Sequence, residues 1–217
     1  MRAVSALGGI VVRVTPEPEP ARRYTADRLR ALPSLIGSAP PLDMAALPRD
    51  PVTLFETWLS EAIELGVAEP LAATLATLDV DGLPDARTLI LKGVDDRGWA
   101  FAGPRSSRKA AQLAAHPAAA LNFWWQPLVR AVRVRGHVVE ADPHESAADF
   151  ARRSSAARDG LDPGDWTLWR IVPARVEFWQ GETDRRHSRI VYGAAADRWT
   201  RAITGKAADD AREGAQE

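Results

Sequence analysis

Between residues 72 and 203 the sequence is a series of short segments in which apolar and polar residues alternate, separated by turn signals. Alternation with a period of two is typical of a β-strand that buries one face, and Asp81-Gly82 is a signal for a hairpin turn. The strands predicted from this pattern are residues 72–79, 87–93, 99–102, 119–125, 128–141, 170–179 and 190–203, the last of which turns near 194–197. Six or more strands joined by hairpins predict an antiparallel barrel.

Three helices are predicted beside these strands. Asp50-Pro51 is a favourable helix start, and apolar residues then recur at helical spacing until Gly66. A short helix is expected over residues 107–115, and a third over residues 142–153. The fold class is therefore expected to be mainly β with flanking helices.

The two ends of the chain differ in composition from its middle. Half of the sixteen prolines lie within the first 51 residues, which predicts an extended or flexible N-terminal arm over residues 1–48. Residues 205–217 are mostly alanine, glycine and charged residues, and are expected to form a disordered C-terminal tail. Residues 49–204 then form one domain.

Composition excludes several classes of function. The chain has no cysteine, which excludes disulfides, thiolate metal sites, iron–sulfur clusters and a cysteine nucleophile. The four histidines are scattered, so no metal site is expected. The net charge of −1 argues against a dedicated nucleic-acid-binding protein, and no apolar run is long enough for a transmembrane helix. We expect a cytoplasmic protein that binds neither nucleic acid nor membrane.

Eight tryptophans against two tyrosines suggest a packed interface or a pocket for a planar ligand. Trp58 lies on the apolar stripe of the first helix, so it is expected in the core. Strand alternation places one ring of the Trp124-Trp125 pair inside the barrel and the other outside.

Basic residues gather at the predicted strand ends. Arg87 and Lys92 bracket an apolar strand, Ser107-Arg108-Lys109 begins a helix, and residues 185–189 hold three arginines and a histidine. Each of these residues taken alone is most simply a solvated surface charge. Together they favour an anionic ligand, because cations and helix N–H groups hold a phosphate and tryptophan suits a planar ring.

Five motifs occur in an order that resembles the pyridoxine/pyridoxamine 5′-phosphate oxidase family, including the related phenazine-biosynthesis flavin oxidases. They are the segments 50–60, Arg87-Thr88-Leu89-Ile90-Leu91-Lys92, Ser107-Arg108-Lys109, Arg130-Ala131-Val132-Arg133 and Phe178-Trp179-Gln180-Gly181 followed by Arg185, His187 and Arg189. The resemblance covers residues 50 to about 200. It implies a split β-barrel homodimer with FMN bound at the subunit interface.

The resemblance also implies roles for single residues. The FMN-binding residues would be Arg87, Thr88, Leu89, Ile90, Lys92, Arg108, Lys109, Trp179 and Arg189. The substrate-binding residues would be Lys92, Arg153, Arg185 and His187, and the catalytic ones among them Arg185 and His187.

The sequence departs from the family pattern at several of its site positions. An aromatic-threonine pair is replaced by Ala102-Gly103, and a glutamine near the flavin by Ala131. A tyrosine and a serine that hold the substrate phosphate are replaced by Asp149 and Ala157. Segment 158–167 is shorter than its counterpart, which includes a Gln-Ser pair that contacts FMN, and the family's Arg-Leu-x-Pro ending is missing. Of these changes, Asp149 bears most directly on the substrate, because its carboxylate would repel a phosphate.

These observations leave three functions open. The first is an FMN-dependent oxidase that carries out two-electron oxidation of a small aromatic or nitrogen-containing substrate, with O₂ as acceptor, in specialised metabolism. The second is a true pyridoxamine/pyridoxine 5′-phosphate oxidase with a trimmed loop. The third is a split-barrel protein that binds a flavin or another cofactor without turnover.

Overall fold

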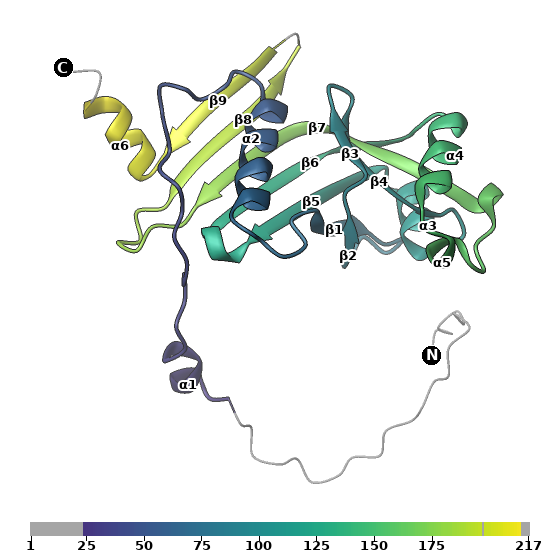
Figure 1. Ribbon diagram of the computed structural model, residues 1–217, viewed down its shortest axis with the longest axis horizontal. Coiled ribbons are helices and arrows are strands. Elements are labelled where there is room, and N and C mark those ends of the chain that lie inside the picture. Colours follow the sequence, from purple (N-terminus) through teal and green to yellow (C-terminus); the bar gives the residue numbers. More distant parts are fainter. Residues whose placement is uncertain (1–23, 197, 214–217) are drawn as a thin grey trace. The chain divides into compact units, whose positions relative to one another are not determined.

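The computed structural model describes residues 24–196 and 198–213 of the 217-residue chain. The chain divides into two units, residues 1–34 and 35–217. The first unit contains helix α1 (Ala26–Arg30), which Thr25 caps. The second unit contains the sheet and the other helices, and its elements are drawn in Figure 1. The predicted arm is only partly covered by this description, since residues 1–23 lie outside the described residues.

Nine antiparallel strands form the sheet of the second unit. The strands are β1 (Ala72–Leu78), β2 (Pro84–Ile90), β3 (Gly93–Asp95), β4 (Gly98–Pro104), β5 (Ala118–Trp125), β6 (Arg130–Glu140), β7 (Trp166–Gln180), β8 (Ser188–Ala195) and β9 (Arg198–Thr204). Their order is β2-β1-β5-β6-β7-β4-β3, and β8 joins the second half of β7 and also pairs with β9. The antiparallel sheet curls into a half-barrel (Figure 1), which confirms the predicted architecture.

The curl follows from the long central strand β7. Its first residues pair with β4 and its last with β8, while β6 runs along almost its whole length. The β6–β7 register shifts between Arg135 and Gly136. A Cβ at Gly136 would lie 1.9 Å from the Val172 carbonyl oxygen, so only glycine allows the strands to approach this closely.

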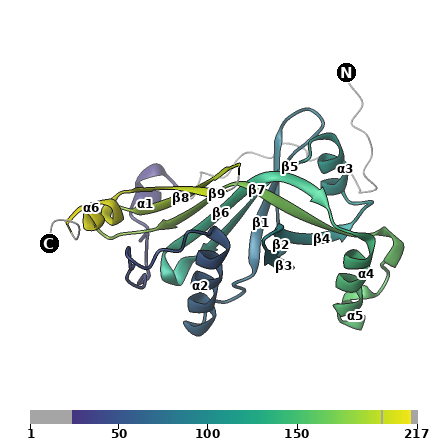
Figure 2. The same ribbon diagram turned by 90° about the horizontal axis from the view of Figure 1, so that it is seen from above.

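The helices of this unit flank the sheet. They are α2 (Pro51–Glu64), α3 (Arg108–Ala115), α4 (Pro143–Arg152), α5 (Ser155–Arg158) and α6 (Lys206–Glu213), with short 3₁₀ turns at Gln126–Leu128 and Pro163–Asp165. Figure 2 shows α2 inside the curl of the sheet. No helix in the described ranges is long and apolar enough to cross a membrane.

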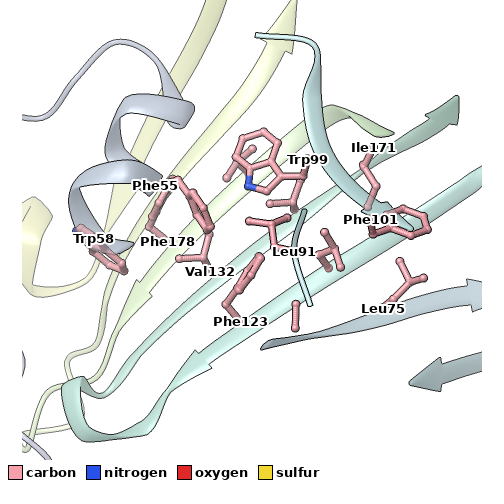
Figure 3. Close-up of a cluster of buried hydrophobic side chains, with 14 of the residues drawn as sticks. Phe55, Trp58, Leu75, Leu91, Trp99, Phe101, Phe123, Val132, Ile171 and Phe178 are labelled. Carbon is pink, nitrogen blue, oxygen red and sulfur yellow. The ribbon is translucent and has the colours of Figure 1, made fainter. Parts of the chain in front are cut away.

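The core lies between α2 and the sheet. The Asp50 carboxylate accepts a hydrogen bond from the Thr53 backbone N–H at 2.9 Å and starts α2 where the sequence predicts. Phe55 is fully buried, with ring centroids 5.8 Å from Trp99 and 5.1 Å from Phe123. Trp58 meets Phe178 edge-to-face at 5.2 Å (Figure 3), which confirms its expected core position.

Two segments differ from their expected lack of structure. Within the predicted arm, Leu42, Met44 and Leu47 pack on the core, so part of residues 35–48 is integral to the domain. Within the predicted tail, α6 forms over Lys206–Glu213, and the Ala207 backbone N–H donates to Ser188 Oγ at 3.1 Å. Ala207 is buried, because small residues allow α6 to dock closely.

Candidate flavin site

A basic cluster forms where α3 begins beside β1 and β2, and we call Arg87, Ser107, Arg108 and Lys109 the α3 cradle. The Arg87 guanidinium donates to Gln112 Oε1 at 2.7 Å, to the Thr77 hydroxyl and to Asp85 Oδ2 at 2.9 Å. These bonds tie β2 to β1 and α3, so the orientation of Arg87 is fixed by buried neighbours.

Lys109 is the cation of the cradle that lacks an acidic partner. Its ammonium donates to Ser107 Oγ at 3.2 Å and lies 5.8 Å from the centroid of the Trp169 ring. Burial lowers the pKa of Lys109 below its ordinary value, and the charge of Arg87 lowers it further. In the described part of the chain no carboxylate lies within ion-pair distance of Lys109, so this charge is left for an external anion.

Glycine at position 103 makes room for Lys109. A Cβ there would lie 2.0 Å from Lys109 Nζ, so any larger residue would push the ammonium aside. Gly103 lies on β4 and pairs with Thr167 on β7. The departure from the family pattern at this position therefore sets the path of the lysine side chain.

Asp85 pairs with both arginines of the cradle. Its Oδ2 accepts hydrogen bonds from Arg87 and from Gln112 Nε2, both at 2.9 Å, and forms an ion pair with Arg108 Nε at 3.3 Å. The hydrogen bond from Gln112 lowers the pKa of Asp85, as do the charges of Arg87 and Arg108, against an opposing effect of burial. The carboxylate is thus ionised at neutral pH, and in the described chain Lys109 is the cation of the cradle that it does not contact.

The other predicted residues of β2 lie along an edge of the sheet. Thr88 and Ile90 are exposed and Leu89 packs on the core, as the alternation predicts. Among the described strands β2 pairs only with β1, so its outer main-chain groups are available to a ligand.

A second group of predicted residues lies at the turn between β7 and β8. Trp179 and Arg189 are direct neighbours across the two strands. The His187 ring lies 4.9 Å from Trp179, centroid to centroid, and its Nδ1 accepts the Glu182 backbone N–H at 3.0 Å. Neutral His187 therefore carries its proton on Nε2. Arg185 adopts a left-handed φ of 68°, which costs free energy in a residue with a Cβ and is frequent at functional sites.

A third group surrounds Lys92, which follows β2. Lys92 lines a cavity of about 190 Å³ together with Asp149, Arg152 and Arg170. Asp149 accepts the Trp166 indole N–H at 2.8 Å.

Arg153 is the C-cap residue of α4. Its guanidinium stacks over the Trp166 ring at 4.2 Å and donates to the Ala157 carbonyl oxygen at 2.7 and 3.1 Å. Two of its donor nitrogens are therefore used within the chain.

One chain does not bring all the predicted residues together. Figure 1 shows α3 and the β7–β8 connection at opposite ends of the half-barrel. Several residues that complete these groups were not predicted from the sequence, namely Asp85, Gln112 and Glu177. Asp85 and Glu177 each lie two residues from a predicted site residue on the same strand face, and this spacing is the signal that could have found them.

Comparison with known proteins shows which family this chain resembles over most of its length. Residues 59–180 match the pyridoxamine 5′-phosphate oxidase family, and residues 166–203 match the pyridoxine 5′-phosphate oxidase C-terminal dimerisation region. A pyridoxine/pyridoxamine 5′-phosphate oxidase from Thermosynechococcus vestitus is 38% identical over 183 residues, covering 70% of this chain and 87% of its own length. One from Paraburkholderia phytofirmans is 38% identical over 182 residues, covering 70% and 85%.

Two solved structures share the fold. PhzG from Burkholderia lata 383, in complex with tetrahydrophenazine-1-carboxylic acid, has a TM-score of 0.71 at 25% identity and covers 78% of this chain and 100% of its own. A pyridoxamine 5′-phosphate oxidase-related, FMN binding protein from Nostoc punctiforme has a TM-score of 0.60 at 20% identity and covers 75% and 100%. The family match and the relatives confirm the resemblance: this chain belongs to the pyridoxamine 5′-phosphate oxidase family and carries its C-terminal dimerisation region.

Proposed function

We propose that this protein is an FMN-dependent oxidase that carries out two-electron oxidation of a small aromatic or nitrogen-containing substrate, with O₂ as the acceptor. The observation that carries the proposal is the half-buried ammonium of Lys109, which has no carboxylate partner in the described chain and lies at the start of α3 beside Arg87. A buried cation without a counter-ion is costly unless a ligand supplies the anion.

The α3 cradle fits a phosphate monoester. Ala110 and Ala111 are the first residues of α3 whose backbone N–H groups bond within the turn, both to the Ser107 carbonyl oxygen. The N–H groups before them face the end of the helix, where an anion is favoured. Arg87, Arg108 and Lys109 would hold the FMN phosphate there, and the free edge of β2 would follow the flavin.

Assembly of the complete site needs two subunits. Trp179 on β7 and Arg189 on β8 lie within the dimerisation region, and Figure 1 shows the β7–β8 connection at the far end of the half-barrel from α3. A homodimer can place the Trp179–Arg189 pair of one subunit next to the cradle of the other. FMN would then lie at the subunit interface, and each dimer would hold two equivalent sites.

The residues of the β7–β8 turn would act on the substrate. Bound FMN supplies the two-electron redox chemistry. In the described part of the chain the Nε2–H of His187 has no hydrogen-bond partner, while Nδ1 is held by the Glu182 backbone, so Nε2–H would donate to a polar group of the substrate. Arg185 would orient the substrate and balance developing charge, and its left-handed backbone supports a role beyond packing.

The surroundings of Lys92 support a substrate without a phosphate group. The Asp149 carboxylate lines the cavity beside Lys92, and it would oppose a dianion. Arg153 already donates two hydrogen bonds to the Ala157 carbonyl oxygen, so these two nitrogens are not available to a phosphate. An aromatic compound of the kind named for the PhzG complex fits these groups better. The alternative, a pyridoxamine 5′-phosphate oxidase, is favoured by the names of the curated relatives.

The test is a flavin titration followed by substrate reduction. The purified protein should bind one FMN per subunit, and the flavin absorbance should bleach when an oxidisable aromatic substrate is added without oxygen. Faster bleaching by pyridoxamine 5′-phosphate would favour the alternative. Arg185→Leu should abolish turnover while FMN stays bound, whereas a non-catalytic binding protein would show no turnover with either substrate. A protein without affinity for FMN would refute the proposal.

A further inference from the structure

Three arginines on the outer face of the sheet converge on one buried carboxylate. The Glu177 side chain on β7 is 8% exposed, and Glu177 lies directly opposite Arg133 on β6. Its Oε2 accepts from Arg133 at 2.9 Å and from Arg175 at 3.0 Å, whereas its Oε1 accepts from Arg189 Nε at 3.0 Å. Each carboxylate oxygen therefore has its own partners, and Oε1 accepts its hydrogen bond from Arg189.

The carboxylate is ionised across the neutral range. Burial by itself would raise the pKa of Glu177, but the charge and hydrogen bond of Arg133, together with Arg189 and Arg175, more than offset burial and hold the pKa low. A buried anion held this way orients the guanidinium that it contacts, since charge-assisted hydrogen bonds are short and directional.

The contact through Nε leaves the far edge of Arg189 available. In the described chain neither terminal nitrogen of Arg189 has a hydrogen-bond partner within the same subunit, and about half of the side chain is exposed. Arg189 pairs with Trp179 across β7 and β8, so the two side chains lie on the same face of the sheet. Glu177 thus holds the guanidinium through Nε and leaves its two terminal nitrogens without a hydrogen-bond partner in the described chain.

We propose that Glu177 is a positioning residue for the cofactor, acting through Arg189. This inference rests on the proposed flavin function, which assigns Trp179 and Arg189 to FMN. The flavin ring presents carbonyl oxygens and a nitrogen that accept hydrogen bonds from a guanidinium, and a guanidinium held in advance loses less side-chain entropy on binding. Three arginines against one glutamate also leave this face with an excess of positive charge, which suits an electron-rich ligand.

The test is a double-mutant cycle read by FMN titration of the apoprotein dimer. Glu177→Gln should raise the FMN dissociation constant about tenfold, because a charge-assisted hydrogen bond becomes a neutral one. Arg189→Met should raise it by at least as much. If Glu177 acts through Arg189, Glu177→Gln adds less than about twofold in the Arg189→Met background. Full additivity of the two effects would overturn the proposal.

A matched control separates positioning from general loss of charge. Arg175→Gln removes a partner of the same carboxylate through Oε2, and it should leave FMN affinity within about twofold of wild type. Should Glu177→Gln fail to fold, Glu177→Asp retains the charge but withdraws it from Arg189, and it should still weaken FMN several-fold. An unchanged affinity in that variant would overturn the inference. A wild-type protein that does not bind FMN would instead refute the proposed function.

Discussion

Replacing Lys109 with methionine separates cofactor binding from stability. Lys109→Met keeps the length and apolar stem of the side chain but removes the charge that has no carboxylate partner in the described chain. A hydrogen bond from a charged donor contributes about 1.5–3 kcal/mol. The dissociation constant of FMN should therefore rise about ten- to 150-fold.

The free energy of unfolding of the Lys109→Met apoprotein should rise or stay unchanged. Burial already lowers the pKa of Lys109, which means that the folded apoprotein disfavours its charge. Methionine fills the same space without that cost. Arg87→Met should behave differently, because Arg87 also ties β2 to Asp85 and Gln112. That variant should lose both FMN affinity and thermal stability.

The assay combines a fluorescence titration of apoprotein with FMN and melting curves with and without the cofactor. Arg105→Met is the matched control, since Arg105 lies just before α3 but pairs with Glu140 at 2.7 and 2.8 Å, outside the cradle. It should bind FMN as wild type does. A Lys109→Met protein that binds FMN within about threefold of wild type would refute the assignment of the phosphate to the cradle.

Four further outcomes follow from the same structure. Gly103→Ala should keep the fold but weaken FMN several-fold in titration, because its Cβ would displace Lys109 Nζ, the flexible end of that side chain. FMN affinity should decline at alkaline pH, starting below the ordinary lysine pKa of 10.5, as Lys109 loses its proton. Because the pKa of Glu177 is lowered in the folded state, its contribution to stability is present above the ordinary value of 4.5 and is lost on acidification below it. Urea unfolding against pH should therefore fall more steeply for wild type than for Glu177→Gln in that acidic range. Phe55→Ala should cost about 3–5 kcal/mol in urea unfolding, because it empties a fully buried aromatic site.

Local patterns in the sequence were sufficient for much of the sheet. Asp81-Gly82 and the alternation around it predict the β1–β2 hairpin, and the structure pairs these strands in register from Ala72 to Ile90. The start of β7 was missed. Its first four residues, from Trp166 to Trp169, precede the predicted start at residue 170, and all four are buried, so they show no alternation from which a strand could be inferred.

Packing of α6 against β8 explains why the predicted C-terminal tail is partly helical. The composition of residues 206–213 alone suggests a tail, yet Ala207 is buried where α6 meets β8. Tertiary contacts of this kind stabilise a helix where composition alone predicts a disordered tail.

The sequence predicts which residue types form the candidate site, but it does not predict how they are arranged in space. The basic residues follow from the family motifs, but which of them is balanced by acid depends on neighbours from other elements. Asp85 pairs with both Arg87 and Arg108, whereas Lys109 has no carboxylate partner in the described chain. That asymmetry needs the α3–β2 contact, which no local pattern specifies.

The most direct measurement of the central claim, a flavin site shared between two subunits, is a subunit-mixing titration. Lys109→Met and Arg189→Met proteins, each deficient in FMN binding, are unfolded together, refolded as mixed dimers and titrated with FMN. If the α3 cradle of one subunit meets Arg189 of the other, each mixed dimer regains one intact site, and about a quarter of all sites bind with wild-type affinity. If no high-affinity sites return, the two residues serve a site within one chain, which contradicts the account.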